Sequence, residues 1–429
     1  MRTSNAAWLT ATETLDAIQA GALSPLEVVA THLERIDRFN PAVAAYVHVD
    51  HDAAPGLGPL AGVTVAVKDT QPVRGMPWTY GSRRWRDRVA GQDGIAVARA
   101  RGQGVALLGK TNTPELAASV GTANELFPPT QNPWRRGRTP GGSSGGSGAA
   151  VASGLCSVAF GDDMGGSVRI PSSCCGVLGL RPSPGRIPVL DPDPTRLSVP
   201  GPLARSVADL RLAFALMTGE VAAGRRPPGR LRVAVVESSP VQVDEPCRAA
   251  CRRAAAFLAA AGHQVEPATW DPMPVAEAYQ VIRPVSVATM PGEPEDYGQA
   301  AGRLIATGRA TPLRDFLDAL SAGQRAVAPL QELMGSCDAI LTPTLGRLPM
   351  PITEVPAFLT EPWSGYTQFV LPVSFAGLPA VSVPAGLHEG LPVGVQLVGR
   401  PWAEWALLDI AEALEAAPGF GFQRPPGFD

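Results

Sequence analysis

The chain has 429 residues, of which 45% are hydrophobic and 17% are charged, and its formal net charge is −3. This composition is typical of a globular protein with a large core and excludes an intrinsically disordered chain. The charge gives no general attraction to nucleic acid or to anionic membranes, and no run approaches the roughly 18 apolar residues of a membrane span.

Hydrophobic periodicity and capping signals predict helices and strands that alternate along the chain. The segment 24–39 begins with Ser24 as N-cap, Pro25 at the first helical position and Glu27 in a capping box, and is expected to be a helix. The other expected elements are a buried strand at 60–69, a helix, turn and strand over 94–112, a candidate linker at 218–231, a strand at 231–238, a helix at 247–261, a strand at 337–345, a strand pair at 379–386 and 391–400, and a helix at 404–417. This alternation predicts an α/β sheet covered on both faces by helices.

The start of the chain and the cysteines give two further expectations. The first 19 residues contain no apolar stretch with a small-residue cleavage site, so they do not indicate a secretory signal peptide. No pair among the six cysteines has zinc-ligand spacing with a second pair. We therefore expect free, mostly buried thiols, a cytoplasmic location and no metal site.

Lysine is rare in this chain. Of the 36 basic residues only Lys68 and Lys110 are lysines, and all the others are arginines. A buried lysine can lose its proton and act as a base, whereas arginine stays protonated. Chance explains the scarcity equally well. Lys68, however, ends the apolar segment GVTVAVK, which is expected to be a buried strand. Burial would lower the pKa of Lys68. Its position at the carboxyl end of a strand is also where ligands bind in open α/β sheets.

The segment 138–154 contains GGSSGGSG, which is compatible with a flexible linker, a phosphate-binding loop or part of an active site. The linker is disfavoured because the sequence after it stays apolar and rich in glycine. A P-loop is disfavoured because no lysine follows the glycines, and a dinucleotide loop because Val151 replaces its third glycine. An active-site role is therefore the favoured interpretation.

The segment DDMGGSVRIPSS can supply a serine nucleophile. Gly165 and Gly166 allow backbone N–H groups to converge beside the hydroxyl of Ser167. None of the five histidines lies in a site-like segment, so nothing favours a Ser-His-Asp triad. Lys68 is the better candidate base, and a second serine could relay the proton to it.

Several motifs together resemble the amidase signature family over nearly the whole chain. They are GGSSGGSGAAVASG, GDDMGGSVRIPSSCCGVLGLRPS, the lysine after GVTVAV, GKTNTPELA, NPW, LTPT and LPVGVQLVGRP. The resemblance implies a Ser-cisSer-Lys catalytic set with Ser167 as the nucleophile, Ser143 as the bridging serine after a cis peptide bond, and Lys68 as the base. It also implies an oxyanion hole, which would be built from Met164, Gly165, Gly166 and Ser167.

The resemblance further implies that Asp163 and Arg169 pair and brace the nucleophile loop. Asp162 stands where the family often has threonine, and the sequence assigns no role to this carboxylate. Met164 replaces a threonine or isoleucine, and Cys174 replaces an aromatic residue. Lys110 lies in the GKTN segment, where a structural role is expected.

We therefore expect a single amidase domain over residues 1–429, with a mixed twisted β-sheet core sandwiched by helices and a variable helical region at about 233–336 that walls the pocket. The expected activity is hydrolysis of a non-peptide carboxylic amide to an acid and ammonia or an amine, without a cofactor. The partner is a small-molecule amide, with no nucleic acid or membrane, and the sequence is compatible with a homodimer. The alternatives are the glutaminase subunit of a tRNA-dependent amidotransferase and a non-catalytic binding protein on the same fold.

The substrate pocket is expected to be lined mainly by aromatic and small polar side chains, which favour small aryl or alkyl primary amides. For each aromatic residue, packing in the core is an equal alternative. The main candidates are Trp78, Tyr80, Asn124, Thr342 and Tyr366, with Met76, Thr122, Thr344, Trp363 and Phe369 as further candidates.

Overall fold

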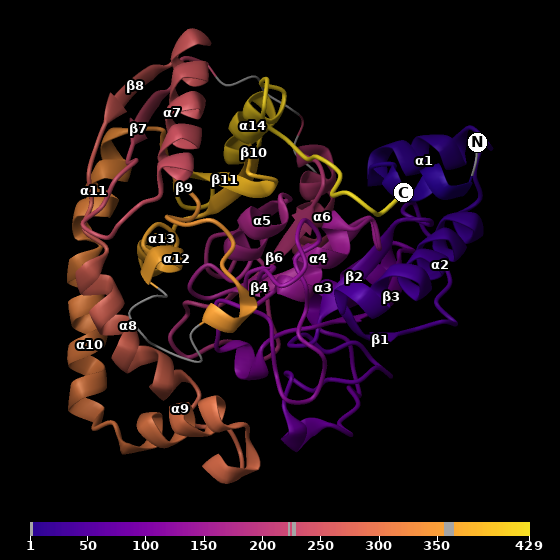
Figure 1. Ribbon diagram of the computed structural model, residues 1–429, viewed down its shortest axis with the longest axis horizontal. Coiled ribbons are helices and arrows are strands. Elements are labelled where there is room, and N and C mark those ends of the chain that lie inside the picture. Colours follow the sequence, from indigo (N-terminus) through magenta and orange to yellow (C-terminus); the bar gives the residue numbers. More distant parts are fainter. Residues whose placement is uncertain (1–2, 222–223, 225–228, 356–363) are drawn as a thin grey trace.

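The computed structural model describes residues 3–221, 224, 229–355 and 364–429. Within these residues the strands form one 11-stranded sheet in the order β1-β3-β2-β4-β6-β5-β10-β11-β9-β7-β8 (Figure 1). The sheet is mixed, since β2 runs parallel to β3 and β4, whereas β10 runs antiparallel to β5 and β11. The predicted fold class, a mixed sheet in an α/β protein, is confirmed.

The strands are short at both edges of the sheet and longest at β10 and β11. Their bounds are β1 Tyr46–Val49, β2 Thr64–Lys68, β3 Ala106–Thr111, β4 Val158–Asp163, β5 Leu178–Arg181, β6 Val199–Ala204, β7 Arg232–Val235, β8 Gln264–Pro267, β9 Ala339–Pro343, β10 Ala380–His388 and β11 Leu391–Val398.

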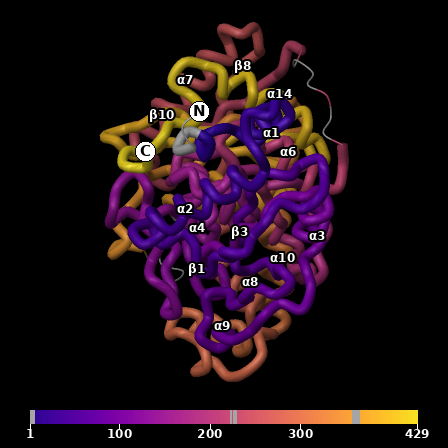
Figure 2. Tube along the Cα trace, turned by 90° about the vertical axis from the view of Figure 1, so that its right-hand side faces the viewer, coloured from indigo at the N-terminus to yellow at the C-terminus, as the bar shows by residue number. Residues whose placement is uncertain are grey.

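The helices surround the sheet, and α8 to α11 extend along one side of the molecule (Figures 1 and 2). Their bounds are α1 Ala11–Gln19, α2 Pro25–Val43, α3 Ile95–Gly102, α4 Gly145–Ala152, α5 Arg169–Cys175, α6 Val207–Thr218, α7 Glu245–Ala260, α8 Met273–Ser286, α9 Gln299–Ala310, α10 Leu313–Ala326, α11 Ala328–Ser336, α12 Ser364–Thr367, α13 Leu371–Phe375 and α14 Glu404–Glu415. The 3-10 helices are η1 Thr3–Trp8, η2 Arg83–Trp85, η3 Glu115–Ala117, η4 Pro294–Asp296 and η5 Ile352–Glu354.

The expected helices and strands appear close to their predicted positions, whereas much of the candidate linker at 218–231 lies outside the described residues. The helix expected at 24–39 is α2, whose N-cap Ser24 exchanges hydrogen bonds with Glu27 in a capping box. The C-terminal strand pair is the antiparallel pair β10 and β11. The glycine-rich segment is not a linker, because it leads directly into the buried helix α4. All six cysteines are free and buried, as expected.

Strand β2 divides its side chains between two hydrophobic clusters. Val65 and Val67 pack with residues of α3 and α6 on one face, while Ala66 packs with residues of α2 and α4 on the other. Successive side chains of a strand point to opposite faces. Lys68 therefore lies on the face of Ala66, toward α4 and the glycine-rich segment before it.

The C-terminal segment packs against the described N-terminal region, where the rings of Trp8 and Phe422 stack (Figure 1). The ring of Phe428 packs against Phe39 of α2, and Arg35 donates a hydrogen bond to the Phe428 carbonyl at 2.6 Å.

Among the described residues, no helix combines the length and the apolar character that crossing a bilayer requires.

Candidate active site

The candidate site lies at the carboxyl ends of the neighbouring strands β2, β3 and β4. These three strands run parallel, so their carboxyl ends lie on the same side of the sheet. Lys68 is the last residue of β2 and Asp163 is the last residue of β4. The sheet therefore brings together two charged residues that are far apart in the sequence.

Lys68 is fully buried, with 0% exposure. Its Nζ lies 2.6 Å from Ser143 Oγ and 2.6 Å from Asp162 Oδ1. Burial lowers the pKa of Lys68, and the Asp162 carboxylate opposes this shift without cancelling it. The predicted contact between the lysine and the bridging serine is present, and the contact with Asp162 was not predicted.

The loop before α4 brings Ser143 to Lys68. The Gly142–Ser143 peptide bond is cis, as the family resemblance implies. A Cβ atom on Gly142 would lie only 2.3 Å from the Gly121 carbonyl oxygen, so only glycine fits there. The backbone N–H of Ser144 donates to the carbonyl of Ser167 at 3.1 Å, which fixes the loop beside the predicted nucleophile.

Ser167 lies between β4 and α5 and is partly exposed, whereas Ser143 is fully buried. The Gly166 N–H donates to Asp163 Oδ1 at 2.9 Å. No hydrogen bond to another described residue engages the N–H groups of Gly165 or Ser167. The segment 164–167 therefore offers these two donors beside an accessible hydroxyl.

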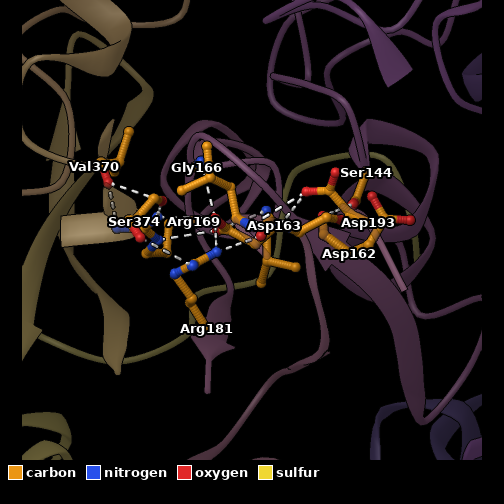
Figure 3. Close-up of polar contacts among 12 residues, drawn as sticks. Ser144, Asp162, Asp163, Gly166, Arg169, Arg181, Asp193, Val370 and Ser374 are labelled. Atoms are coloured by element: carbon orange, nitrogen blue, oxygen red, sulfur yellow. Dashed lines mark hydrogen bonds and ion pairs between the residues drawn. The ribbon is translucent and has the colours of Figure 1, made fainter. Parts of the chain in front are cut away.

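Asp163 and Arg169 form a buried ion pair with two parallel hydrogen bonds (Figure 3). Arg169 Nε donates to Oδ2 at 3.0 Å and Nη2 donates to Oδ1 at 2.8 Å. Arg181 contributes a second guanidinium, 3.2 Å from Oδ1. Burial alone would raise the pKa of Asp163, but Arg169, Arg181 and the backbone N–H of Val168 together outweigh it and hold the pKa well below its usual range.

Arg169 also connects the start of α5 to α13 and β11. It donates to the Val370 carbonyl at 3.0 Å, to Gln396 Oε1 at 2.7 Å and to Ser374 Oγ at 2.8 Å. Sequence reasoning did not single out Arg181, Ser374 or Gln396. Arg181 and Gln396 do lie inside the motifs GLRPS and LPVGVQLVGRP, which were the only signal that could have found them.

Lys110 is fully buried and bonds to the segment that follows β2. Its Nζ contacts Asp69 Oδ1 at 3.0 Å and donates to the carbonyls of Gln71 at 2.8 Å and Pro77 at 3.0 Å. These bonds hold the segment that follows β2 against β3. They agree with the structural role expected for Lys110.

Trp78 and Tyr80 belong to an aromatic group after β2. Their ring centroids lie 5.9 Å apart, and Trp85 packs edge-on against Tyr80. The guanidinium of Arg88 lies 4.0 Å from the Trp78 ring centroid. The rings pack against one another and against Arg88, and their part in a substrate pocket stays a prediction.

Asn124 and Thr122 line a cavity of about 270 Å³. Thr122 donates to the Gly141 carbonyl at 2.8 Å, so the cavity adjoins the loop that carries Ser143. The Asn124 amide is occupied by bonds to Asn112 and Thr113, both at 2.8 Å.

Thr342 and Tyr366 are both fully buried. The Thr342 hydroxyl donates to the Pro343 carbonyl, and the Tyr366 hydroxyl bonds to the backbone of Leu348 and Met350. These contacts place both side chains in the interior of the protein, and their part in a substrate pocket stays a prediction. Three of the further candidates, Met76, Thr344 and Phe369, are also buried, and Trp363 lies outside the described residues.

Helix α8 belongs to the region expected to wall the pocket and carries Tyr279, which the sequence did not single out. Tyr279 lies over Gly165, since a Cβ atom built there would be 3.3 Å from the Tyr279 hydroxyl. Arg283, one turn later, is buried and donates to the Leu116 carbonyl at 2.7 Å. Among the described residues, no group of three or more His, Cys, Asp or Glu side chains could hold a metal ion.

Comparisons with known proteins identify the family of the chain. The family model described as Amidase matches residues 27–408. The chain is 32% identical to an acylamidase of Rhodococcus erythropolis, over 99% of this chain and 98% of that protein. It is 33% identical to a glutamyl-tRNA(Gln) amidotransferase subunit of Thermus thermophilus, over 95% of this chain and 97% of that protein.

A solved structure has the same fold as this chain. The structure of 6-aminohexanoate cyclic dimer hydrolase complexed with substrate superposes with a TM-score of 0.92 at 30% identity, covering 99% of this chain and all of that chain. The match in sequence extends over nearly the full length, and so does the match in fold. The chain therefore belongs to the amidase signature family of amide-hydrolysing enzymes.

Proposed function

We propose that this enzyme hydrolyses a small carboxylic amide through an acyl-enzyme, with Ser167 as the nucleophile, Ser143 as the proton relay and Lys68 as the base. The observation that carries the proposal is the 2.6 Å contact between Lys68 Nζ and Ser143 Oγ in a fully buried setting. A neutral amine at this distance can accept the proton of the hydroxyl. The burial that lowers the pKa of Lys68 favours the neutral amine.

In the acylation step, Ser167 Oγ bonds to the carbonyl carbon of the amide. The Ser167 proton moves to Ser143 Oγ while the Ser143 proton moves to the Lys68 lone pair. The electron pair of the carbonyl π bond passes to the oxygen, which accepts hydrogen bonds from the N–H groups of Gly165 and Ser167. The C–N bond then breaks, and the leaving nitrogen takes the proton that returns from Lys68 through Ser143.

In the deacylation step, water attacks the acyl carbon and gives its proton to the same relay. Ser167 Oγ leaves and recovers a proton, which releases the acid and restores the enzyme. The ion pair of Asp163 and Arg169 holds the Gly166 N–H and so keeps the turn before Ser167 in place. Both half-reactions use this chain's own side chains and backbone.

For the substrate, we propose small aryl or alkyl amides. The Trp78, Tyr80 and Trp85 rings and the Tyr279 ring over Gly165 support an apolar acyl group. The relatives named acylamidase and 6-aminohexanoate cyclic dimer hydrolase are compatible with this class. The relative named as a glutamyl-tRNA(Gln) amidotransferase subunit makes glutamine hydrolysis for a tRNA partner the alternative.

Two measurements test the proposal. A serine-directed fluorophosphonate should label the wild-type protein at Ser167 and leave Ser167→Ala unlabelled, and kcat of that variant should fall by several orders of magnitude. Labelling elsewhere, or normal turnover by Ser167→Ala, would overturn the assignment of the nucleophile. Absence of labelling together with absence of turnover in the folded wild type would favour a non-catalytic binding protein.

A competition assay decides the substrate class. Phenylacetamide-type amides, alkyl amides, glutamine and asparagine are offered together, and the ammonia and acids that form are quantified. We expect an aryl or alkyl amide to be consumed fastest. Faster turnover of glutamine than of every other amide would favour the amidotransferase alternative, and co-purification with a tRNA-binding partner would support it.

A further inference from the structure

Asp162 has no role in the proposed reaction, yet it touches the base directly. Its Oδ1 lies 2.6 Å from Lys68 Nζ, and its Oδ2 accepts a hydrogen bond from the Thr70 hydroxyl. Both carboxylate oxygens are therefore engaged, and the orientation of the carboxylate is fixed. The Asp162 side chain is 18% exposed, whereas that of Lys68 is 0% exposed.

The hydrogen-bonding capacity of the two groups restricts what each can do. A neutral amine has two N–H donors and one lone pair, and an ionised carboxylate only accepts. Asp162 must therefore receive an N–H of Lys68. Ser143 is the other polar partner of Lys68 Nζ among the described residues, so the lone pair can face the Ser143 hydroxyl.

The same carboxylate acts after the proton has moved. Once Lys68 has accepted the proton it is an ammonium ion in a buried site, where an unpaired charge is costly. Asp162 supplies the opposite charge at contact distance. An aspartate holds and stabilises the histidine base of serine hydrolases in the same way.

We propose, building on the proposed function, that Asp162 is a positioning residue for the base: it holds one N–H of Lys68, directs the lone pair to Ser143 and neutralises the ammonium that forms. Asp162 thereby extends the Ser167, Ser143 and Lys68 relay by one member.

Other charges around Lys68 do not duplicate this contact. Asp163 lies next to Asp162 on β4, but it pairs with Arg169 and Arg181. Arg283 on α8 opposes the positive charge of Lys68, whereas Asp162 and Asp163 favour it. Among the described residues, Asp162 is the carboxylate that forms an ion pair with Lys68.

The proposal predicts a specific change in pH dependence. Asp162→Asn removes a charge that stabilises the Lys68 ammonium, so Lys68 becomes neutral at lower pH. The acid limb of the rate profile should therefore move down by about one pH unit or more. The plateau rate should fall about tenfold or more, because the ammonium formed during the reaction loses its counter-ion.

The experiment measures the second-order rate of fluorophosphonate labelling of Ser167 across pH, which needs no knowledge of the substrate. Asp162→Asn and Asp162→Thr both remove the charge, so one can replace the other if it fails to fold. Asp162→Glu retains the charge and should keep the acid limb of the wild type. Asp87→Asn is the control, since it removes an exposed carboxylate.

The results distinguish a failure of the role proposed for Asp162 from a failure of the proposed function. A downward shift of the acid limb in both neutral variants, but not in Asp162→Glu or Asp87→Asn, is the expected result. If a folded neutral variant labels more slowly with an unmoved acid limb, Asp162 is only structural and the inference fails. If the wild type is not labelled at Ser167, the proposed function itself fails.

Discussion

Lys68 and Lys110 lie on adjacent parallel strands but face opposite sides of the sheet. In the register of β2 and β3, Lys68 lies opposite Thr111 and Lys110 lies opposite Val67. Thr111 bonds to Ser147 of α4, while Val67 packs in the cluster on the other face. The two lysines of this chain therefore meet different partners and should respond differently to substitution.

Replacement of Lys68 should abolish the relay even when the positive charge is retained. Lys68→Arg should reduce kcat nearly as much as Lys68→Ala, because a guanidinium stays protonated and cannot accept the proton of Ser143. In the wild type, activity should be lost as the pH falls through the pKa of Lys68, which burial lowers from its usual value. Steady-state rates across pH check both statements, and an active Lys68→Arg enzyme would exclude a neutral lysine base.

Replacement of Lys110 should affect stability and not the proton relay. Lys110→Met leaves Asp69 buried without its cation and should lower the free energy of unfolding by about 3–5 kcal/mol. Denaturant unfolding measures that loss. The pH–rate profile, recorded at a temperature where the variant is folded, should keep the acid limb of the wild type. A shifted acid limb would show that Lys110 acts on the base.

Removal of the Arg169 side chain should destabilise the nucleophile loop. Arg169→Ala removes one of the two guanidinium groups that pair with the buried Asp163 and should cost about 3–5 kcal/mol at neutral pH. The folded protein holds the pKa of Asp163 below its unfolded value, so this ion pair stabilises the fold above about pH 4. That stabilisation is lost as the pH falls.

Unfolding of wild type and Arg169→Ala is therefore compared from pH 7 to pH 3. The difference in stability should be largest at the neutral end and should narrow on acidification. A difference that stays constant with pH would mean that the ionised Asp163 carboxylate does not contribute to it.

A methyl group at Gly146 should be tolerated poorly. A Cβ atom there would lie 2.4 Å from the Asn112 nitrogen and 2.6 Å from its carbonyl oxygen, and both are backbone atoms. Gly146→Ala should therefore lower the free energy of unfolding by about 1–3 kcal/mol or more. Gly102→Ala is the matched control, because nothing lies within 4 Å of that position and the change reduces the entropy of the unfolded chain. Equal stability of the two variants in denaturant unfolding would contradict the close packing of α4.

The sequence by itself predicted the fold class, the positions of several helices and strands, and the residues of the proposed relay. Local signals are sufficient for this: the Ser24 capping box starts α2, and the apolar run before Lys68 forms β2. The motifs around Ser143 and Ser167 are long enough to carry the family resemblance. Their catalytic roles remain predictions until the labelling experiment is done.

Only the tertiary structure decided which side chains meet. The alternation of β2 and the register of β3 place Lys68 toward Ser143 and Lys110 away from it, and neither is visible in composition. Asp162 comes into contact with Lys68 although 94 residues separate them, because β2 and β4 are neighbours in the sheet. Packing buries Thr342 and Tyr366 completely, which their positions in the sequence did not show. Contacts between distant segments depend on strand order and packing, and a linear pattern of residue types specifies neither.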